Sequence, residues 1–238
     1  MPDNWDFTQK PQRAGAVGQT PILTYLLLAL SVVTTAAYLT AGNQPGTLWY
    51  SVGHFGFAET PGAAPWSLIT TVFIHGSWPH LLFDMLWLVQ LGRILETTLS
   101  PVVYLAFLVA AAAVGGGCQF LLSGGTGIGM SGVVYAMFAL MWAGRGGYPA
   151  WGTVATQANL RLLVGWGIFC AVATYSGLFH AFGLPNIANG AHGGGFLFGL
   201  SVGFLFFMPR RRWVWAAPLV LLVGATVFSA IRLHTISL

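Results

Sequence analysis

Charged side chains are scarce in this chain: Lys, Arg, Asp and Glu together make up 6% of its 238 residues. A soluble domain usually carries about 25%, so the composition excludes an ordinary soluble protein. The formal net charge is +4, with nine basic and five acidic residues. Because the basic residues are spread along the chain instead of forming one patch, the charge is not typical of nucleic-acid binding, and we expect no nucleic-acid partner.

Cysteine is also rare. Cys118 and Cys170 both lie inside apolar runs, which indicates packing and gives no support for a disulfide. The first twenty residues are polar and lack a signal-peptide pattern. We therefore interpret residues 1–20 as a cytoplasmic tail.

Hydrophobic residues, by contrast, make up 56% of the chain, and apolar runs long enough to span a bilayer recur along it. The sequence predicts an all-α polytopic membrane protein with seven helical spans, at about 21–40, 79–97, 101–122, 131–144, 159–179, 190–208 and 213–231. The fourth run is short, which indicates a helix buried by its neighbours. Residues 41–78 are too apolar for a solvated loop and too interrupted for a span, so we expect an interfacial connection lying partly in the membrane.

The positions of the basic residues orient the spans. If the N-terminus is cytoplasmic, all basic residues except Arg232 fall on the cytoplasmic side, as the positive-inside rule requires. These residues are Lys10, Arg13, Arg93, Arg145, Arg161 and Arg210–212. Spans two, four and six then all enter from the outer face. His80, Ser131 and His192 begin these three spans, so we expect them at a similar depth below that face.

Ser131 lies between glycines where the fourth span begins, in the segment GMSG. An intramembrane serine most often bonds its own helix or packs a close helix contact. It can also be a nucleophile, because Gly129 and Gly132 expose its hydroxyl, and the first N–H groups of a helix lack internal partners and can stabilise an oxyanion. The residues around Ser131 fit both interpretations.

His192 is the candidate base. A histidine inside a membrane span is costly and is by default a candidate functional residue, although a hydrogen-bonded structural role is the alternative. Ala191, Gly195 and Gly199 form a small-residue face beside it. We expect this face to press against the fourth span at Gly132 and Ala136, as a Ser–His hydrogen bond requires.

The acidic residues offer no obvious third member of a catalytic triad. Glu96 falls at the cytoplasmic end of its span, nothing points to Glu59 in the outer connection, and Asp84 is the only acidic residue deep in a span. The sequence therefore predicts a Ser–His dyad.

A metal site is the alternative interpretation of the second span. His80 and Asp84 are four residues apart and share a helix face, with His75 five residues earlier. The spacing is not HExxH, and no cysteine or glutamate completes a ligand set. We therefore expect neither a metal nor another cofactor to take part in catalysis.

Three motifs on three spans resemble those of the rhomboid family of intramembrane serine proteases. GMSGVVYA (129–136) is similar to the family's GxSG nucleophile motif, and NGAHGGGFLFG (189–199) is similar to its AHxxGxxxG motif. HGSWPHLLFDMLWL (75–88) resembles the motif of its second helix. The resemblance covers about 21–208 and implies a rhomboid-like six-helix catalytic core, with residues 41–78 as its L1 connection and residues 209–238 as a basic loop and an extra seventh helix.

The resemblance also implies roles. Ser131 would be the nucleophile and His192 the general base, with His80 and the backbone N–H of Ser131 lining the oxyanion hole. Tyr135 would pack near His192. The substrates would be single-span membrane proteins, cleaved near the outer end of a destabilised helix at small residues, and the location would be the bacterial inner membrane.

Two residues depart from the family pattern. Asp84 stands where the family usually has an asparagine that helps to bind the oxyanion. An ionised carboxylate would repel that oxyanion, whereas a protonated one could donate a hydrogen bond to it. Ser67, in PWSL (65–68), replaces the arginine that commonly follows the tryptophan of the L1 connection.

Two other functions are alternatives to proteolysis. A catalytically inactive rhomboid-like protein would bind transmembrane clients for quality control or trafficking. Such proteins typically lack the serine or the histidine, and Asp84 is the feature that favours this alternative. A small-molecule transporter would require an inverted repeat, which the sequence does not contain in convincing form.

Overall fold

The structure is a computed structural model that describes residues 20–41, 65–207 and 212–236. These residues form helices and no strands, which confirms the predicted all-α class. Seven helices are long: α1 (Ile22–Ala41), α4 (Trp78–Thr98), α5 (Pro101–Ser123), α6 (Ser131–Gly144), α8 (Gln157–Tyr175), α10 (Asn189–Phe207) and α11 (Arg212–Ile236). Four short ones lie between them: α3 (Ser67–Thr70), η1 (Thr71–Phe73), α7 (Pro149–Gly152) and α9 (Leu178–Ala181).

Local sequence signals set where the long helices begin. The hydroxyl of Ser77 accepts a hydrogen bond from the N–H of His80 at 3.3 Å and caps α4, whose first turn contains Pro79. Ser100 and Pro101 start α5 in the same way. Such caps satisfy N–H groups that a helix leaves free, and proline fits the first turn because it lacks an N–H.

Five of the described helices are long and apolar enough to cross a membrane: α1, α5, α8, α10 and α11. The other two predicted spans differ from these in composition or length, because α4 carries three charged residues and α6 has only 14 residues. The fifth span ends at Tyr175, four residues before the predicted end. Gly177 follows with φ +76°, and its left-handed conformation separates α8 from α9.

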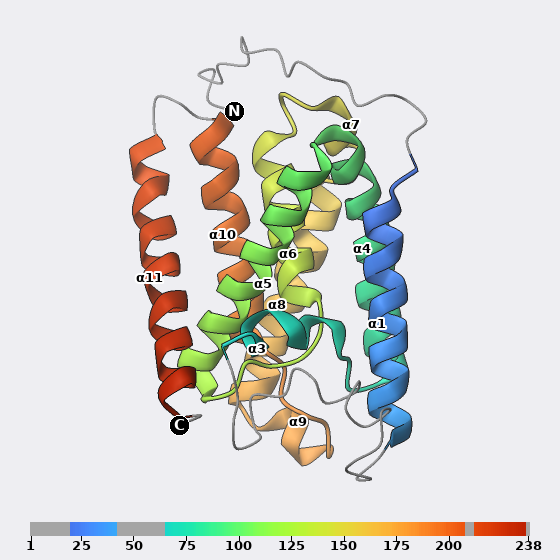
Figure 1. Ribbon diagram of the computed structural model, residues 1–238, viewed down its shortest axis with the longest axis vertical. Helices are drawn as coiled ribbons and strands as arrows, with labels where there is room; N and C mark the ends of the chain where they lie inside the picture. Colours follow the sequence, from blue (N-terminus) through green and yellow to red (C-terminus); the bar gives the residue numbers. More distant parts are fainter. Residues whose placement is uncertain (1–19, 42–64, 208–211, 237–238) are drawn as a thin grey trace.

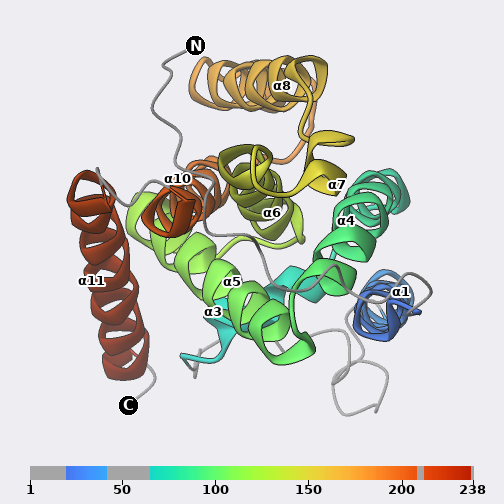
Figure 2. The ribbon, with the colours of Figure 1, turned by 90° about the horizontal axis from the view of Figure 1, so that it is seen from above.

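The short helix α6 lies at the centre of the bundle, with α4, α5, α8 and α10 around it (Figure 2). Nearly all its residues are buried, which explains how a run of this length avoids lipid. Helices α4, α6 and α10 run in one direction, opposite to α1, α5, α8 and α11 (Figure 1). The three helices that carry the candidate site residues therefore begin at the same end of the molecule.

The predicted small-residue face joins α10 to α6. A Cβ added at Gly195 would overlap the carbonyl oxygen of Gly132, and one at Gly199 would overlap that of Ala136. The two backbones thus approach as closely as glycine allows. This contact brings the first turn of α10, with His192, against the first turn of α6.

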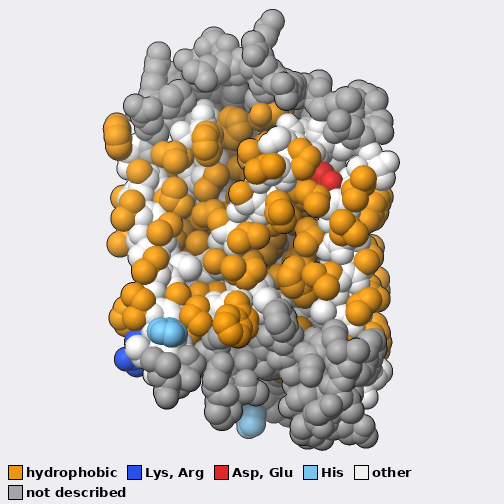
Figure 3. Space-filling view, viewed as in Figure 1, with side chains coloured by type: hydrophobic (Ala, Val, Ile, Leu, Met, Phe, Trp, Pro, Cys, Tyr) orange, Lys and Arg blue, Asp and Glu red, His pale blue; other side chains and the backbone are white. Residues whose placement is uncertain are grey.

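Hydrophobic side chains cover most of the middle of the face seen in Figure 3, and charged side chains are few there. This surface fits a multi-pass membrane protein. The predicted cytoplasmic tail and most of the predicted interfacial connection (residues 42–64) lie outside the described residues, so those two expectations stay predictions. Within the connection, α3 and η1 pack against α5 and α1.

Candidate active site

Ser131 and His192 face each other across the contact between α6 and α10. Ser131 is the first residue of α6, and His192 lies in the first turn of α10. The Oγ of Ser131 is 2.7 Å from the Nε2 of His192, within hydrogen-bond distance. The imidazole is buried, with 7% of the residue exposed. The glycines that let α10 pack closely against α6 are therefore also the residues that bring Ser131 and His192 into contact.

Tyr135 fixes the plane of the His192 ring. The two rings stack with their centroids 4.7 Å apart and an interplanar angle of 20°. The hydroxyl of Tyr135 donates a hydrogen bond to the carbonyl of Leu163 on α8 at 2.7 Å. The tyrosine is thus anchored at both ends and restricts the rotation of the imidazole, as the resemblance implied for this position.

The second ring nitrogen of His192, Nδ1, is buried and has no hydrogen-bond partner among the described residues. No carboxylate of these residues orients the imidazole, and the Ser–His dyad stays a prediction. Glu59, the acidic residue of the outer connection, lies outside the described residues.

The loop before α6 approaches α4 closely at Gly129. This residue has φ +104°, which favours glycine, and a Cβ on it would lie 2.6 Å from the Nε2 of His80. Its N–H donates to the carbonyl of Thr71 at 3.2 Å and is therefore already used. The N–H of Val134 makes the first bond of the helix, to Met130, so the N–H of Ser131 has no partner within α6.

His75, His80 and Asp84 form a cluster beside this loop. The Oδ2 of Asp84 is 3.1 Å from the Nε2 of His75 and 3.5 Å from the Nε2 of His80. His75 is fully buried and the Asp84 side chain is 9% exposed, whereas 34% of the His80 side chain is accessible. The accessible His80 is the member of the cluster that can meet a substrate.

Two residues that position the site were missed by the sequence reasoning. The side chain of Gln119 on α5 accepts hydrogen bonds from the N–H groups of Gly190 (2.7 Å) and Ala191 (3.3 Å), and so caps α10 just before His192. His75, considered only as a metal ligand, accepts a hydrogen bond from the N–H of Met130 at 3.4 Å, next to Ser131. A buried glutamine in an apolar run was the available signal, because such a group needs a partner.

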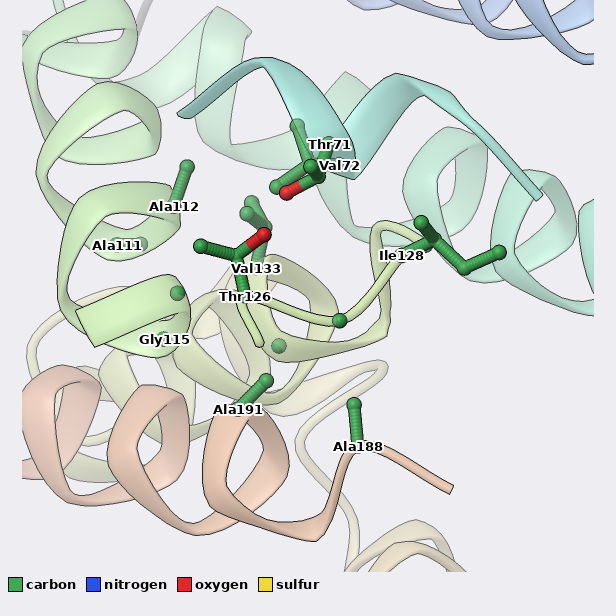
Figure 4. A pocket seen from close by; sticks show the side chains of 14 residues that line it. Thr71, Val72, Ala111, Ala112, Gly115, Thr126, Ile128, Val133, Ala188 and Ala191 are labelled. Carbon is green, nitrogen blue, oxygen red and sulfur yellow. The ribbon is translucent and has the colours of Figure 1, made fainter. Parts of the chain in front are cut away.

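A narrow recess is lined by Gly129 and Gly132 and holds no more than about one water molecule. Figure 4 shows its walls, which come from η1, α5, the loop before α6, and the first turns of α6 and α10. Most of the lining side chains are small: they are glycine, alanine and threonine, with Val72, Ile128 and Val133 as the larger ones. The wall beside the first turn of α6 is therefore built mainly from small residues.

Comparisons with known proteins agree with the motifs. The family model for the rhomboid domain matches residues 63–209. The chain is 30% identical over 201 residues to the rhomboid protease GlpG of Salmonella typhi, an alignment that covers 84% of this chain and 67% of the relative. It is 29% identical, with the same coverage, to the rhomboid proteases GlpG of Salmonella choleraesuis and Salmonella newport. The matched domain includes the three helices that carry Ser131, His192 and the histidine cluster.

Proposed function

The chain belongs to the rhomboid family of intramembrane serine proteases, and we propose that Ser131 and His192 are its catalytic pair. The observation that carries this proposal is the 2.7 Å approach of the Ser131 hydroxyl to the imidazole Nε2 of His192. A nucleophile and a base within hydrogen-bond reach, on helices locked together by glycines, are what acyl transfer to a serine requires.

His192 acts as the base. Its Nε2 accepts the proton of Ser131 while Oγ bonds to the scissile carbonyl carbon, and the carbonyl π electrons become an oxyanion. The imidazolium then gives this proton to the leaving amine as the C–N bond breaks, leaving an acyl-enzyme. Water that enters from the outer face hydrolyses the ester with the same base. For Nε2 to accept a proton, neutral His192 must carry its hydrogen on Nδ1.

The oxyanion forms beside the first turn of α6. We assign its stabilisation to the N–H of Ser131 and to the Nε2–H of His80, the accessible imidazole of the cluster. Gly129 contributes space, because a side chain there would collide with His80. Donors held in place before reaction favour the charge that develops in the transition state.

The substrates are transmembrane segments of single-span membrane proteins, unwound near the outer end of their helix. The recess next to Gly129 and Gly132 supports a small residue at the cleavage site, because its walls are formed largely by glycine, alanine and threonine. We place the protein in the bacterial inner membrane with its N-terminus in the cytoplasm. The site then opens towards the outer face, since α4, α6 and α10 begin there.

Cleavage of a transmembrane reporter in proteoliposomes tests this proposal. The wild-type protein should release the reporter fragment, and Ser131→Ala should release none although it inserts and folds equally well. Ser201→Ala is the matched control, because it removes a buried intramembrane hydroxyl that is not part of the proposed site. Full cleavage by purified Ser131→Ala would exclude the proposed nucleophile. A wild-type protein that binds the reporter without cutting it would be the inactive, client-binding alternative.

A further inference from the structure

We propose that His75, His80 and Asp84 form a binding site for one divalent transition-metal ion of the zinc class, beside the proposed oxyanion hole. Each residue offers one ligand atom, and the three ligand atoms all lie within 4.8 Å of one another. Two imidazoles and one carboxylate are a ligand set that suits zinc and leaves a fourth position open.

The contacts of His75 leave its Nε2 directed at the cluster. Its Nδ1 lies 3.2 Å from the hydroxyl oxygen of Thr35, within hydrogen-bond distance. When neutral His75 carries its hydrogen on Nδ1, Nε2 has a lone pair, and the N–H of Met130, 3.4 Å away, points at this atom as it would at an acceptor. This tautomer is the one that can bind a metal ion through Nε2.

In this tautomer the Nε2 of His75 and the Oδ2 of Asp84, 3.1 Å apart, are two acceptors facing each other. Both groups are buried, so their mutual repulsion would be little screened by water. A positive charge between them, either a proton on Nε2 or a metal ion, removes this repulsion.

Two of the three spacings between ligand atoms match a tetrahedral zinc site. Zinc binds imidazole nitrogen and carboxylate oxygen at about 2.0–2.2 Å, which places tetrahedral ligand atoms about 3.4 Å apart. Asp84 Oδ2 is 3.1 Å from the Nε2 of His75 and 3.5 Å from that of His80, and the ligand atoms of the two histidines lie within 4.8 Å of each other. The bond from His75 Nδ1 to Thr35 is the outer contact that metal-binding histidines typically make.

The cluster is accessible at His80. Its side chain is 34% exposed, the most of the three, and Gly129 has no side chain to cover it. A Cβ at position 129 would lie 2.6 Å from the Nε2 of His80 and 3.3 Å from the Oδ2 of Asp84. An ion can therefore reach these atoms from the side of Ser131.

The carboxylate is essential to this proposal. The neutral side-chain amide of an asparagine at position 84 is a much weaker ligand for such an ion than a carboxylate. Bound metal would take the Nε2 of His80 away from the oxyanion and so inhibit cleavage. That consequence rests on the proposed function, whereas the binding itself does not.

Titration with Co²⁺ tests the binding, with the full chain purified through a tag that contains no histidine. Wild type should bind one Co²⁺ with the strong visible absorption of a four-coordinate ion, and Zn²⁺ should displace it. Asp84→Asn should weaken binding at least tenfold, whereas His180→Gln, which changes a histidine outside the cluster, should bind as wild type does. Equal affinity in wild type and Asp84→Asn, or no four-coordinate spectrum in wild type, would overturn the proposal and leave a proton as the shared charge.

Labelling with a fluorophosphonate separates this proposal from the proposed function. Without metal, wild type should be labelled at Ser131, and circular dichroism should show that Asp84→Asn is folded. Each protein is compared with its own metal-free rate: saturating Zn²⁺ should slow labelling of wild type and of His180→Gln at least tenfold, and that of Asp84→Asn less than twofold. Absence of labelling in metal-free wild type would contradict the proposed nucleophile and not the metal site. Equal slowing of wild type and Asp84→Asn by Zn²⁺ would contradict inhibition through Asp84.

Discussion

Helix α4 carries two buried acidic residues, Asp84 and Glu96, and their surroundings differ. Both oxygens of Glu96 accept hydrogen bonds: Oε1 accepts from the N–H of Leu23 (2.8 Å), and Oε2 accepts from the N–H (2.8 Å) and the hydroxyl (2.7 Å) of Thr24. Asp84 meets only imidazoles, at 3.1 and 3.5 Å. The residues are twelve positions apart, about 18 Å along the helix.

Glu96 is a structural carboxylate, whereas Asp84 belongs to the proposed metal site. Glu96 accepts the free N–H groups at the start of α1, where a negative charge is also favoured by the helix dipole. It fastens α1 to α4, and three hydrogen bonds occupy most of its acceptor capacity. Asp84 lies beside an accessible histidine and an open glycine loop. The same residue class thus stabilises one end of α4 and takes part in binding chemistry at the other.

The largest effect on cleavage is expected from a substitution in the proposed active site. His192→Ala removes the base that accepts the Ser131 proton, and should lower cleavage of the transmembrane reporter by about a thousandfold or more. Single-turnover assays in proteoliposomes measure this rate. Glu96→Gln, at the opposite end of α4, is the matched control and should retain cleavage per folded molecule. An active His192→Ala variant would show that another group serves as the base.

The largest effect on stability is expected from substitution of Glu96, at the end of α4 that contacts α1. Glu96→Ala leaves two backbone N–H groups and the Thr24 hydroxyl without their acceptor, and should lower the free energy of unfolding by about 3 kcal/mol. Denaturant titration in detergent measures this change, and Glu96→Gln should lose less because it keeps an oxygen acceptor. A loss below about 0.5 kcal/mol, the size expected of a surface substitution, would contradict a capping role.

A smaller effect on stability and cleavage is expected from substitution of Tyr135, whose ring stacks on His192. Tyr135→Phe removes the hydrogen bond to Leu163 and keeps the ring stacked on the imidazole, so it should cost about 1 kcal/mol of stability. Cleavage should fall only a few-fold. Tyr135→Ala, which removes the ring as well, should reduce cleavage further. Equal cleavage rates for Tyr135→Phe and Tyr135→Ala would mean that the stacking does not orient His192.

The smallest effect on cleavage is expected at Asp84. In metal-free buffer near neutral pH, Asp84→Asn should leave cleavage equal to that of wild type or raise it, because the amide cannot repel the oxyanion. The ratio of the two initial rates, measured in parallel with chelator present, checks this expectation. A large loss of activity would assign Asp84 a specific role as an acid, and would bring its importance closer to that of His192.

The sequence was sufficient to predict the contact between Ser131 and His192. The small-residue spacing at Ala191, Gly195 and Gly199 predicted a close helix contact, and the positions of the basic residues placed both side chains at the same end of the bundle. The starts of α4 and α5 were also predictable, because serine and proline mark them locally.

Other features depend on contacts that no local pattern reports. The partner of the His75 Nδ1 is Thr35, forty residues earlier on α1. The cap on α10 comes from Gln119 on a different helix, 71 residues before Gly190. Both features are decided by side chains distant in sequence. The end of α8 at Tyr175 is different, because it is set locally by the left-handed turn at Gly177.

The most direct test of the central claim is to locate a covalent fluorophosphonate adduct by mass spectrometry. In metal-free wild-type protein, the phosphonyl group should be found on Ser131 alone, and His192→Ala should be labelled far more slowly. Both results follow from a serine whose proton is taken by an imidazole 2.7 Å away. An adduct on another serine, or equal labelling of Ser131 without His192, would contradict the account.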